Sequence, residues 1–212
     1  MKPYVAVERD FIFRNEKSLG EAQFSSQALV RVIVYCVVDI KSSGHELYPD
    51  VYVSTKLRNN VQLTDTHYGV IDDNAYFNYR LVFPLTTQEE ILSPLEIRAM
   101  DFDFITGDDQ LGTLYLDLSA VPFPPRDPKH CTLTTLDRGP KVNMFDVEDG
   151  ISQISGFWPL AKNKKLRPFT KTMSAKIHLT LQVLTEEKAE LFPASSGNEK
   201  GPLNQFPSLS VP

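Results

Sequence analysis

The chain has 212 residues, with 22 lysines and arginines against 27 aspartates and glutamates, and its formal net charge is −5. The hydrophobic fraction of 42% is typical of a globular protein, and no apolar run reaches the roughly 18 residues that a transmembrane helix needs. The mild acidity argues against bulk binding of nucleic acid, which needs a basic domain.

The two cysteines, Cys36 and Cys131, are too few for a disulfide framework or a four-cysteine zinc site. Met1–Asp10 has no apolar core after a basic cluster, so it does not have the pattern of a secretory signal. Together these features favour a reducing, cytosolic setting.

Polar residues dominate the N-terminal stretch 1–27, and we expect an arm or linker there. Glu16–Gln27 is typical of a flexible connector, and one strand is expected before it at Tyr4–Phe13.

Strand-like segments follow at hairpin spacing. Leu29–Val37 is rich in β-branched residues, and Val51–Leu57 alternates between apolar and polar positions. Further strands are expected at Leu63–Tyr68, Tyr76–Phe83, Leu95–Met100, Leu111–Leu118, Ile154–Leu160 and Ala175–Leu184. This pattern predicts an all-β fold, an eight-stranded antiparallel β-sandwich with a long insertion between the sixth and seventh strands.

The strand-like pattern stops near the end of the chain. Thr185–Leu191 predicts a short helix capped by Thr185. Phe192–Pro212 has few charges, no apolar period and spaced prolines, which is typical of a chain that cannot fold alone. We therefore predict a domain over residues 28–193 and a disordered, proline-rich tail or linker over 194–212.

Aspartates gather in one predicted hairpin loop, Met100–Gly112 (MDFDFITGDDQLG). Asp101, Asp103, Asp108 and Asp109 would repel one another there unless a cation is present or the loop is well hydrated. Carboxylate oxygens in such loops are the ligands that calcium prefers. The loop is not an EF-hand, because it lacks the glutamate at position 12 and the flanking helices.

Two further acidic loops are expected at the same end of the sandwich. Asp50 begins the second strand, and Asp72 and Asp73 precede the fourth. In an up-and-down count of antiparallel strands, the first, third and fifth connections share one end. Three acidic loops then converge on a metal site, although aspartate also favours turns for local reasons alone.

Two apolar residues, Phe104 and Ile105, lie at the tip of the acidic hairpin loop. They could belong to the core, but a hairpin tip points to solvent, so we expect them to insert into a membrane. Burying both would contribute about 3–6 kcal/mol before losses.

A basic run joins the last two strands and includes Lys162, Lys164, Lys165 and Arg167. It is either a solvated loop or a site for lipid or phosphoinositide, since each basic residue near an anionic bilayer contributes about 1 kcal/mol. The strand count places it at the acidic end.

The sequence offers no enzyme motif. It lacks H-E-x-x-H, a glycine-rich phosphate loop and the G-x-S-x-G elbow. Phe157 and Trp158 are expected to pack in the core or at a sheet edge. We therefore expect a non-enzymatic module.

Several segments resemble a known family. PDVYV (Pro49–Val53) and DFD…DDQLG (Asp101–Gly112) resemble the calcium loops of C2 domains. Longer segments occur in the same order in the last C2 domain of ferlins, before their C-terminal membrane anchor. These include TDTHY (64–68), FNYRLVFP (77–84), GDDQLGTLYLDLSAVPFP (107–124), KHC (129–131), SGFWPL (155–160) and AKIHLTLQVLTEEKAE (175–190).

The resemblance covers about 28–193 and implies a C2 sandwich of type II topology. It implies calcium-dependent binding to anionic phospholipid, a role in vesicle fusion or membrane repair, and contacts with fusion-machinery proteins. It also implies a place on the cytosolic face of a plasma or vesicle membrane, with a C-terminal transmembrane helix in the longer ferlin-like protein.

The ferlin resemblance further assigns metal-ligand positions to Asp50, Asp101, Asp103 and Asp109, with Asp108 beside them. One position departs from the family pattern, because Gly44 stands where another loop aspartate is expected. Further candidates are Asp39, Glu46 and Asp73. The departure keeps a second hypothesis open, a calcium-independent scaffold that grips a protein or phosphoinositide through its basic loop.

Overall fold

The computed structural model describes residues 28–41, 48–85, 93–147, 149–164, 167–191 and 201–203. The expected strand at Tyr4–Phe13 lies outside these residues. Among the described residues, no helix is long and apolar enough to span a bilayer.

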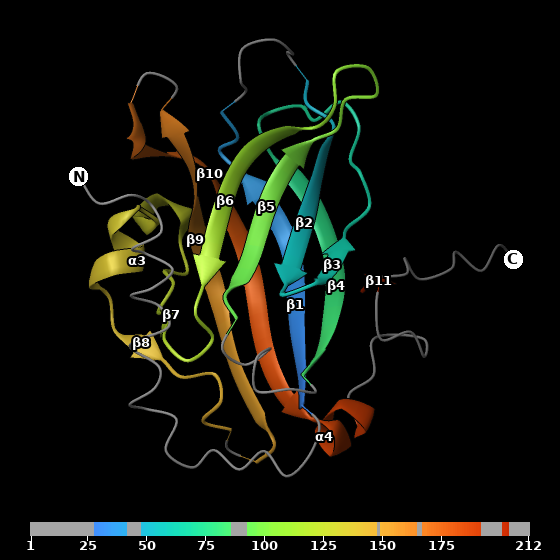
Figure 1. Ribbon diagram of the computed structural model, residues 1–212, viewed down its shortest axis with the longest axis vertical. Coiled ribbons are helices and arrows are strands. Elements are labelled where there is room, and N and C mark those ends of the chain that lie inside the picture. The colour runs from blue at the N-terminus through green and yellow to red at the C-terminus, as the bar shows by residue number, and fades with distance from the viewer. Residues whose placement is uncertain are drawn as a thin grey trace, which may run out of the picture.

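The fold is an antiparallel sheet rolled into two facing layers (Figure 1). One layer has the order β4-β1-β10-β9 and the other β6-β5-β2-β3, joined by a single pair between Thr113 of β6 and Ala161 of β9. The strands are β1 (Ala28–Val38), β2 (Val51–Leu57), β3 (Asn60–Leu63), β4 (Ala75–Leu85), β5 (Leu95–Asp101), β6 (Asp109–Leu116), β9 (Ile151–Lys164) and β10 (Arg167–Thr185).

These eight strands confirm the predicted all-β architecture. The first strand, β1, pairs with β4 on one side and with the last long strand, β10, on the other. This is the type II order. A short ninth strand, β11 (Gly201–Pro202), is added beside β4.

The core lies between the two layers. Along β1, Val30, Val32 and Val34 are buried with no exposed surface, because every second side chain of a strand points to the same face. Trp158 on β9 is also fully buried, as expected, and its indole Nε1–H donates to the Pro122 carbonyl at 3.3 Å.

The predicted insertion is present between β6 and β9. It contains β7 (Val121–Pro122), η1 (Pro128–His130), α3 (Thr134–Arg138) and β8 (Lys141–Val142). Its chain approaches β9 so closely that a Cβ atom on Gly156 would lie 2.7 Å from the Pro125 carbonyl oxygen. Glycine at this position therefore lets the insertion pack against the sheet.

One strand differs from its expected position. We predicted the third strand at Leu63–Tyr68, but β3 is Asn60–Leu63. A tight turn follows β2 directly, with Arg58 at a φ of 53°, so the hairpin partner begins earlier. Beyond Leu63 the chain is no longer in a strand, and an isolated β-bridge joins His67 to Val51.

The region after β10 also differs in part from expectation. Helix α4 (Glu186–Leu191) forms, and the Thr185 hydroxyl accepts from the Lys188 amide at 3.4 Å, as a capping residue does. Within the predicted unstructured tail, however, Gly201–Leu203 pairs with β4, where Leu203 N donates to Asn78 O at 2.8 Å. An edge strand offers unpaired backbone groups, so pairing there needs no apolar side chains.

Candidate functional site: an acidic end with an apolar tip

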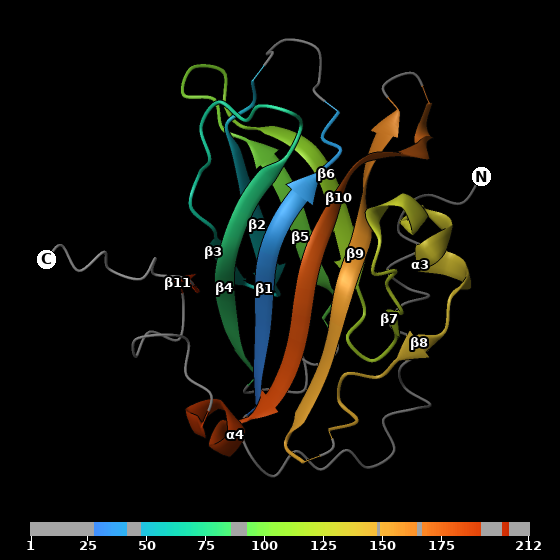
Figure 2. The same cartoon turned by 180° about the vertical axis from the view of Figure 1, so that it is seen from behind.

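The predicted acidic loops meet at one end of the sandwich, as both views show (Figures 1 and 2). Strand register explains this arrangement. Val51 at the start of β2 pairs with Asp101 at the end of β5, and Asp101 pairs with Asp109 at the start of β6. Asp50 precedes Val51 directly, so three aspartates at the ends of three neighbouring strands lie at the same level.

Hydrogen bonds fix Asp50 and Asp101 in this end. The Asp50 amide donates to Asp101 Oδ1 at 2.8 Å, and Asp50 Oδ1 accepts from the Gly69 amide at 2.7 Å. The second bond ties the β3–β4 loop to the start of β2. Asp101 is only 8% exposed, whereas the loop aspartates beyond it face solvent more freely.

The β5–β6 loop is organised by Asp103. Its Oδ1 accepts from the Ile105 amide at 2.7 Å and from the Thr106 amide at 3.2 Å, and its Oδ2 accepts from the Thr106 hydroxyl. The Thr106 hydroxyl and the two amides hold the pKa of Asp103 below its usual value. Hydrogen bonds to a carboxylate favour its charged form.

Asp108 is held by Tyr52 and by the loop itself. The Tyr52 hydroxyl donates to Asp108 Oδ2 at 2.6 Å, and the Asp103 amide donates to Asp108 Oδ1 at 3.2 Å. Burial, together with the hydrogen bond and charge of Asp108, raises the pKa of Tyr52 to about 12. Tyr52 and Thr106 are therefore parts of this end that the sequence pattern did not predict. The position of Tyr52 between core-facing Val51 and Val53 was the one signal that it points away from the core.

The ligand atoms suit a hard cation, because every candidate ligand residue would offer carboxylate oxygens. Within the described residues, however, no three His, Cys, Asp or Glu side chains are grouped so that they could hold a metal ion. The carboxylates of Asp50, Asp101, Asp103 and Asp108 accept hydrogen bonds from protein groups instead. A cation would have to compete with these donors.

The further metal-ligand candidates, Asp39, Asp73 and Glu46, either make other contacts or lie outside the described residues. Asp39 Oδ2 pairs with Lys176 Nζ at 2.5 Å, so this carboxylate already has a cationic partner. Asp73 is exposed in the β3–β4 loop, and its carbonyl accepts from the Ile40 amide at 3.1 Å. Glu46 and Gly44 lie outside the described residues.

Phe104 and Ile105 are 90% and 89% exposed at the tip of the β5–β6 loop. Their exposure agrees with the predicted loop tip and excludes a place in the core. Tyr68 and Ile71 in the neighbouring β3–β4 loop are also exposed, and the Tyr68 ring meets Phe102 edge-on at 6.5 Å. Exposed apolar side chains thus lie in both of these loops, which also carry aspartates.

The predicted basic loop is largely strand: Lys162 and Lys164 belong to β9 and Arg167 to β10, at the end of a β9–β10 hairpin that lies at the same end of the molecule (Figure 2). Lys162 pairs with Thr172 across the two strands and is half-buried. The side chains of Lys164 and Arg167, and Lys165 altogether, lie outside the described part of the chain. Their predicted membrane contacts stay a prediction.

Comparisons with known proteins agree with this architecture. The sequence profile of the C2 domain family matches residues 28–133, half of the chain. The chain is 29% identical to myoferlin of Xenopus tropicalis over 87% of its own length, and 26% identical to Fer-1-like protein 4 of Mus musculus over 76%. In each comparison it spans only 11% of the relative.

Among solved structures, a C2 domain of plant Extended Synaptotagmin 1 aligns with 74% of this chain and 95% of that chain, at 16% identity and a TM-score of 0.48. The calcium-bound pair of C2 domains of Extended-Synaptotagmin 2 aligns with 82% of this chain and 49% of that chain, at 14% identity and a TM-score of 0.49. The family profile and the strand order carry the assignment: the chain belongs to the C2 domain family, and its sequence relatives within that family are ferlins.

Proposed function

We propose that this domain binds anionic phospholipid membranes through its acidic end in a calcium-dependent manner. The observation that carries the proposal is the register that aligns Asp50, Asp101 and Asp109 at one end of the sheet, the end that also carries the exposed Phe104 and Ile105. Calcium would lie between these carboxylates and the lipid phosphates. Asp103 and Asp108 would join them once released from their hydrogen bonds.

The proposal predicts weak intrinsic calcium binding that tightens on a membrane. Calcium takes six to eight oxygen ligands, and it binds more weakly where fewer charged ligands are available. Here Gly44 replaces one expected aspartate, and Tyr52 and Thr106 occupy oxygens of Asp108 and Asp103. Lipid phosphates can supply the remaining oxygens.

The test is co-sedimentation with phosphatidylserine vesicles, with calcium or with a chelator. Asp103→Asn should abolish most of the calcium-dependent binding, because it removes a charged ligand. Asp137→Asn is the matched control, since Asp137 is an exposed aspartate in α3 of the insertion. The proposal is wrong if calcium adds no vesicle binding to the unchanged chain.

A calcium-independent scaffold is the second candidate. The hydrogen-bonded aspartates and the β9–β10 hairpin at the same end favour it. Under this alternative, vesicles or a protein partner would bind equally with calcium and with chelator. Replacing Lys162, Lys164, Lys165 and Arg167 with glutamine would then abolish binding.

The setting of the domain is also a proposal. Because the chain spans about a tenth of its ferlin relatives, a role in vesicle fusion or membrane repair belongs to a longer protein. In that longer protein we propose that the domain lies next to a C-terminal membrane anchor, on the cytosolic face of a plasma or vesicle membrane, as the ferlin resemblance suggests. No enzymatic step is proposed, and fusion-machinery proteins are the expected partners.

A further inference from the structure

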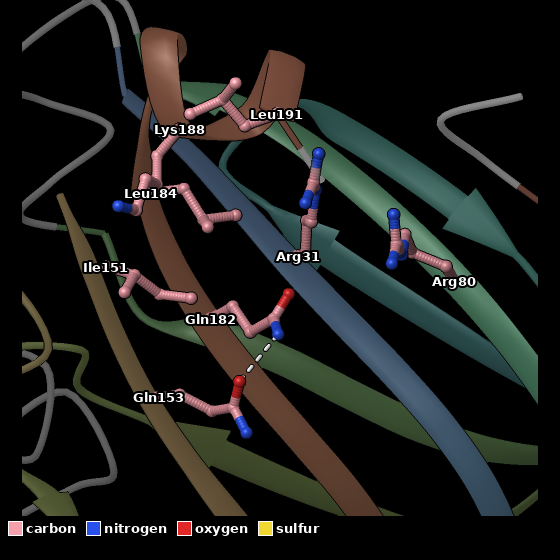
Figure 3. A pocket seen from close by; sticks show the side chains of 8 residues that line it. All are labelled: Arg31, Arg80, Ile151, Gln153, Gln182, Leu184, Lys188 and Leu191. Atoms are coloured by element: carbon pink, nitrogen blue, oxygen red, sulfur yellow. Dashed lines mark hydrogen bonds between the residues drawn. The ribbon is translucent and has the colours of Figure 1, made fainter. Parts of the chain in front are cut away.

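A cavity of about 560 Å³ lies on the outer face of the β4-β1-β10-β9 layer, beside α4 (Figure 3). Arg31 and Arg80 line it, but both are buried and interact with other groups of the chain. Arg31 Nη2, for example, donates to the Ala189 carbonyl of α4 at 2.9 Å. The two charges are therefore engaged within the chain, and an accessible reactive group is found instead at the acidic end, far from α4 (Figure 1).

Thr106 presents a hydroxyl at the tip of the β5–β6 loop. Every residue from Phe104 to Gln110 is exposed. A Cβ atom on Gly107 would meet no other atom within 4 Å, so this part of the loop stands clear of its surroundings. Thr106 is thus accessible to the cleft of a modifying enzyme.

Carboxylates follow Thr106 at the spacing that acidophilic protein kinases select, two and three positions after the target hydroxyl. Asp108 and Asp109 occupy these positions, and both are exposed. Kinases choose their substrates partly by charge pattern. Basic side chains in the cleft of such a kinase would pair with the two carboxylates while Thr106 lies at the phosphate.

Two other hydroxyls share part of this pattern but not its setting. Among the described serines and threonines, only Ser93, Thr106 and Thr134 have a carboxylate three positions later. The one after Ser93 is Glu96, which is only 8% exposed and ion-paired. The one after Thr134 is exposed Asp137, but Thr134 lies within helix α3, whereas a kinase cleft binds its substrate in an extended form.

The Thr106 hydroxyl can leave its present partner while the loop keeps its turn. It donates to Asp103 Oδ2. The other oxygen, Asp103 Oδ1, accepts from the Ile105 amide at 2.7 Å and from the Thr106 amide at 3.2 Å. These two backbone bonds do not involve the hydroxyl, so the turn does not depend on it.

We propose that Thr106 is a phosphorylation site for an acidophilic protein kinase, and that its phosphate weakens membrane binding through the acidic end. In the transfer, Thr106 Oγ1 attacks the γ-phosphorus of ATP and a new O–P bond forms. The bond from that phosphorus to the bridging oxygen breaks, ADP leaves, and the hydroxyl proton passes to a base of the kinase. The effect on membrane binding rests on the proposed function, whereas the modification site does not.

A phosphate on Thr106 changes the charge of the loop tip. It carries about −1.5 to −2 charges near pH 7, and it follows directly the apolar pair Phe104 and Ile105. Anionic lipid repels such a group, and its burial in the bilayer is costly, so vesicle binding should weaken by about tenfold or more. Calcium should in turn slow the phosphorylation, because Asp108 and Asp109 cannot pair with a kinase while they hold a cation.

The modification site is tested with the full chain, Mg²⁺, ATP and casein kinase 2 as the probe enzyme. EGTA removes calcium and leaves Mg²⁺ for the ATP. Fragmentation mass spectrometry should locate a phosphate at Thr106 and none at Thr134. Asp109→Asn should slow the modification by about tenfold, since a charged contact with the kinase is lost, and Thr106→Ala should remove it. No phosphate at Thr106, or one that forms no faster than at Thr134, overturns the proposal while leaving calcium-dependent membrane binding untouched.

Co-sedimentation with phosphatidylserine vesicles in calcium tests the effect on membrane binding. The phosphorylated chain should bind more weakly than the unmodified one, and Thr106→Glu more weakly than Thr106→Gln, which has a similar size without the charge. Thr134→Glu is the matched control, because it adds a charge in the insertion and should leave binding unchanged.

Equal binding of the phosphorylated and unmodified chains overturns the effect of the phosphate. If the unmodified chain itself shows no calcium-dependent binding, the proposed function fails and the effect on membrane binding fails with it. The mass spectrum still decides the modification site in that case, so the two failures can be told apart.

Discussion

The hydrogen bond between Tyr52 and Asp108 is one of the contacts at the acidic end with which a cation would have to compete. Asp108 Oδ2 accepts from the Tyr52 hydroxyl at 2.6 Å, and a hydrogen bond to a charged group contributes about 1.5–3 kcal/mol. We expect Tyr52→Phe to tighten calcium binding about tenfold in calorimetry without lipid. Tyr115→Phe, which removes a hydroxyl bonded to Glu96, should not change it. Equal or weaker calcium affinity in Tyr52→Phe would contradict this view of the site.

His178 gives the sheet a pH response through a single side chain. Its ring stacks on Phe157 at 4.5 Å and lies near Tyr35 at 4.8 Å, and burial lowers its pKa. The unfolded chain therefore protonates His178 at a higher pH than the folded chain does. Stability should fall as the pH drops below about 6.5 toward the lower folded pKa. Urea unfolding at several pH values should show a flatter profile for His178→Gln, while exposed His130→Gln should keep the original slope.

Among the elements, the tip of the β5–β6 loop is expected to contribute to membrane binding but not to the stability of the fold. Phe104 and Ile105 make little contact with the core, so changing both to alanine should leave the melting temperature nearly unchanged. Vesicle association should weaken, because about 3–6 kcal/mol of apolar burial is lost before other costs. Phe123→Ala, an exposed aromatic of the insertion, is the control for vesicle binding. A large drop in melting temperature would instead mean that the pair supports the fold.

Across the molecule as a whole, the chain after α4 returns to the edge of β4. Ending the chain after Leu203 keeps β11, and should leave the melting temperature unchanged. Ending it after Leu191 removes the pairing of Gly201 and Pro202 with Arg80 and Tyr79. We expect a loss of about 1–3 kcal/mol, since each lost hydrogen bond costs about 0.5–1.5 kcal/mol. Identical melting curves for the two truncated chains would show that β11 adds nothing to stability.

Local patterns in the chain were enough to predict the main strands other than β3, the insertion and the loops that carry the aspartates. Period-two alternation and β-branched residues are local signals, so the pattern of Val51–Leu57 predicts that strand with its observed bounds. The long β1 run and the short α4 are likewise predicted within a residue or so at each end. Antiparallel strands also determine which loops share an end, which is why the acidic loops could be placed together.

The contacts that these residues make followed only from the folded arrangement. The alignment of Val51, Asp101 and Asp109 depends on register, and the bonds from Tyr52 and Thr106 depend on the conformation of one loop. Arg31 and Arg80 occur in the sequence as charges within apolar strands, but their meeting required β1 and β4 to pair across a long stretch of chain. Such contacts are set by packing between segments distant in sequence, so no local pattern records them.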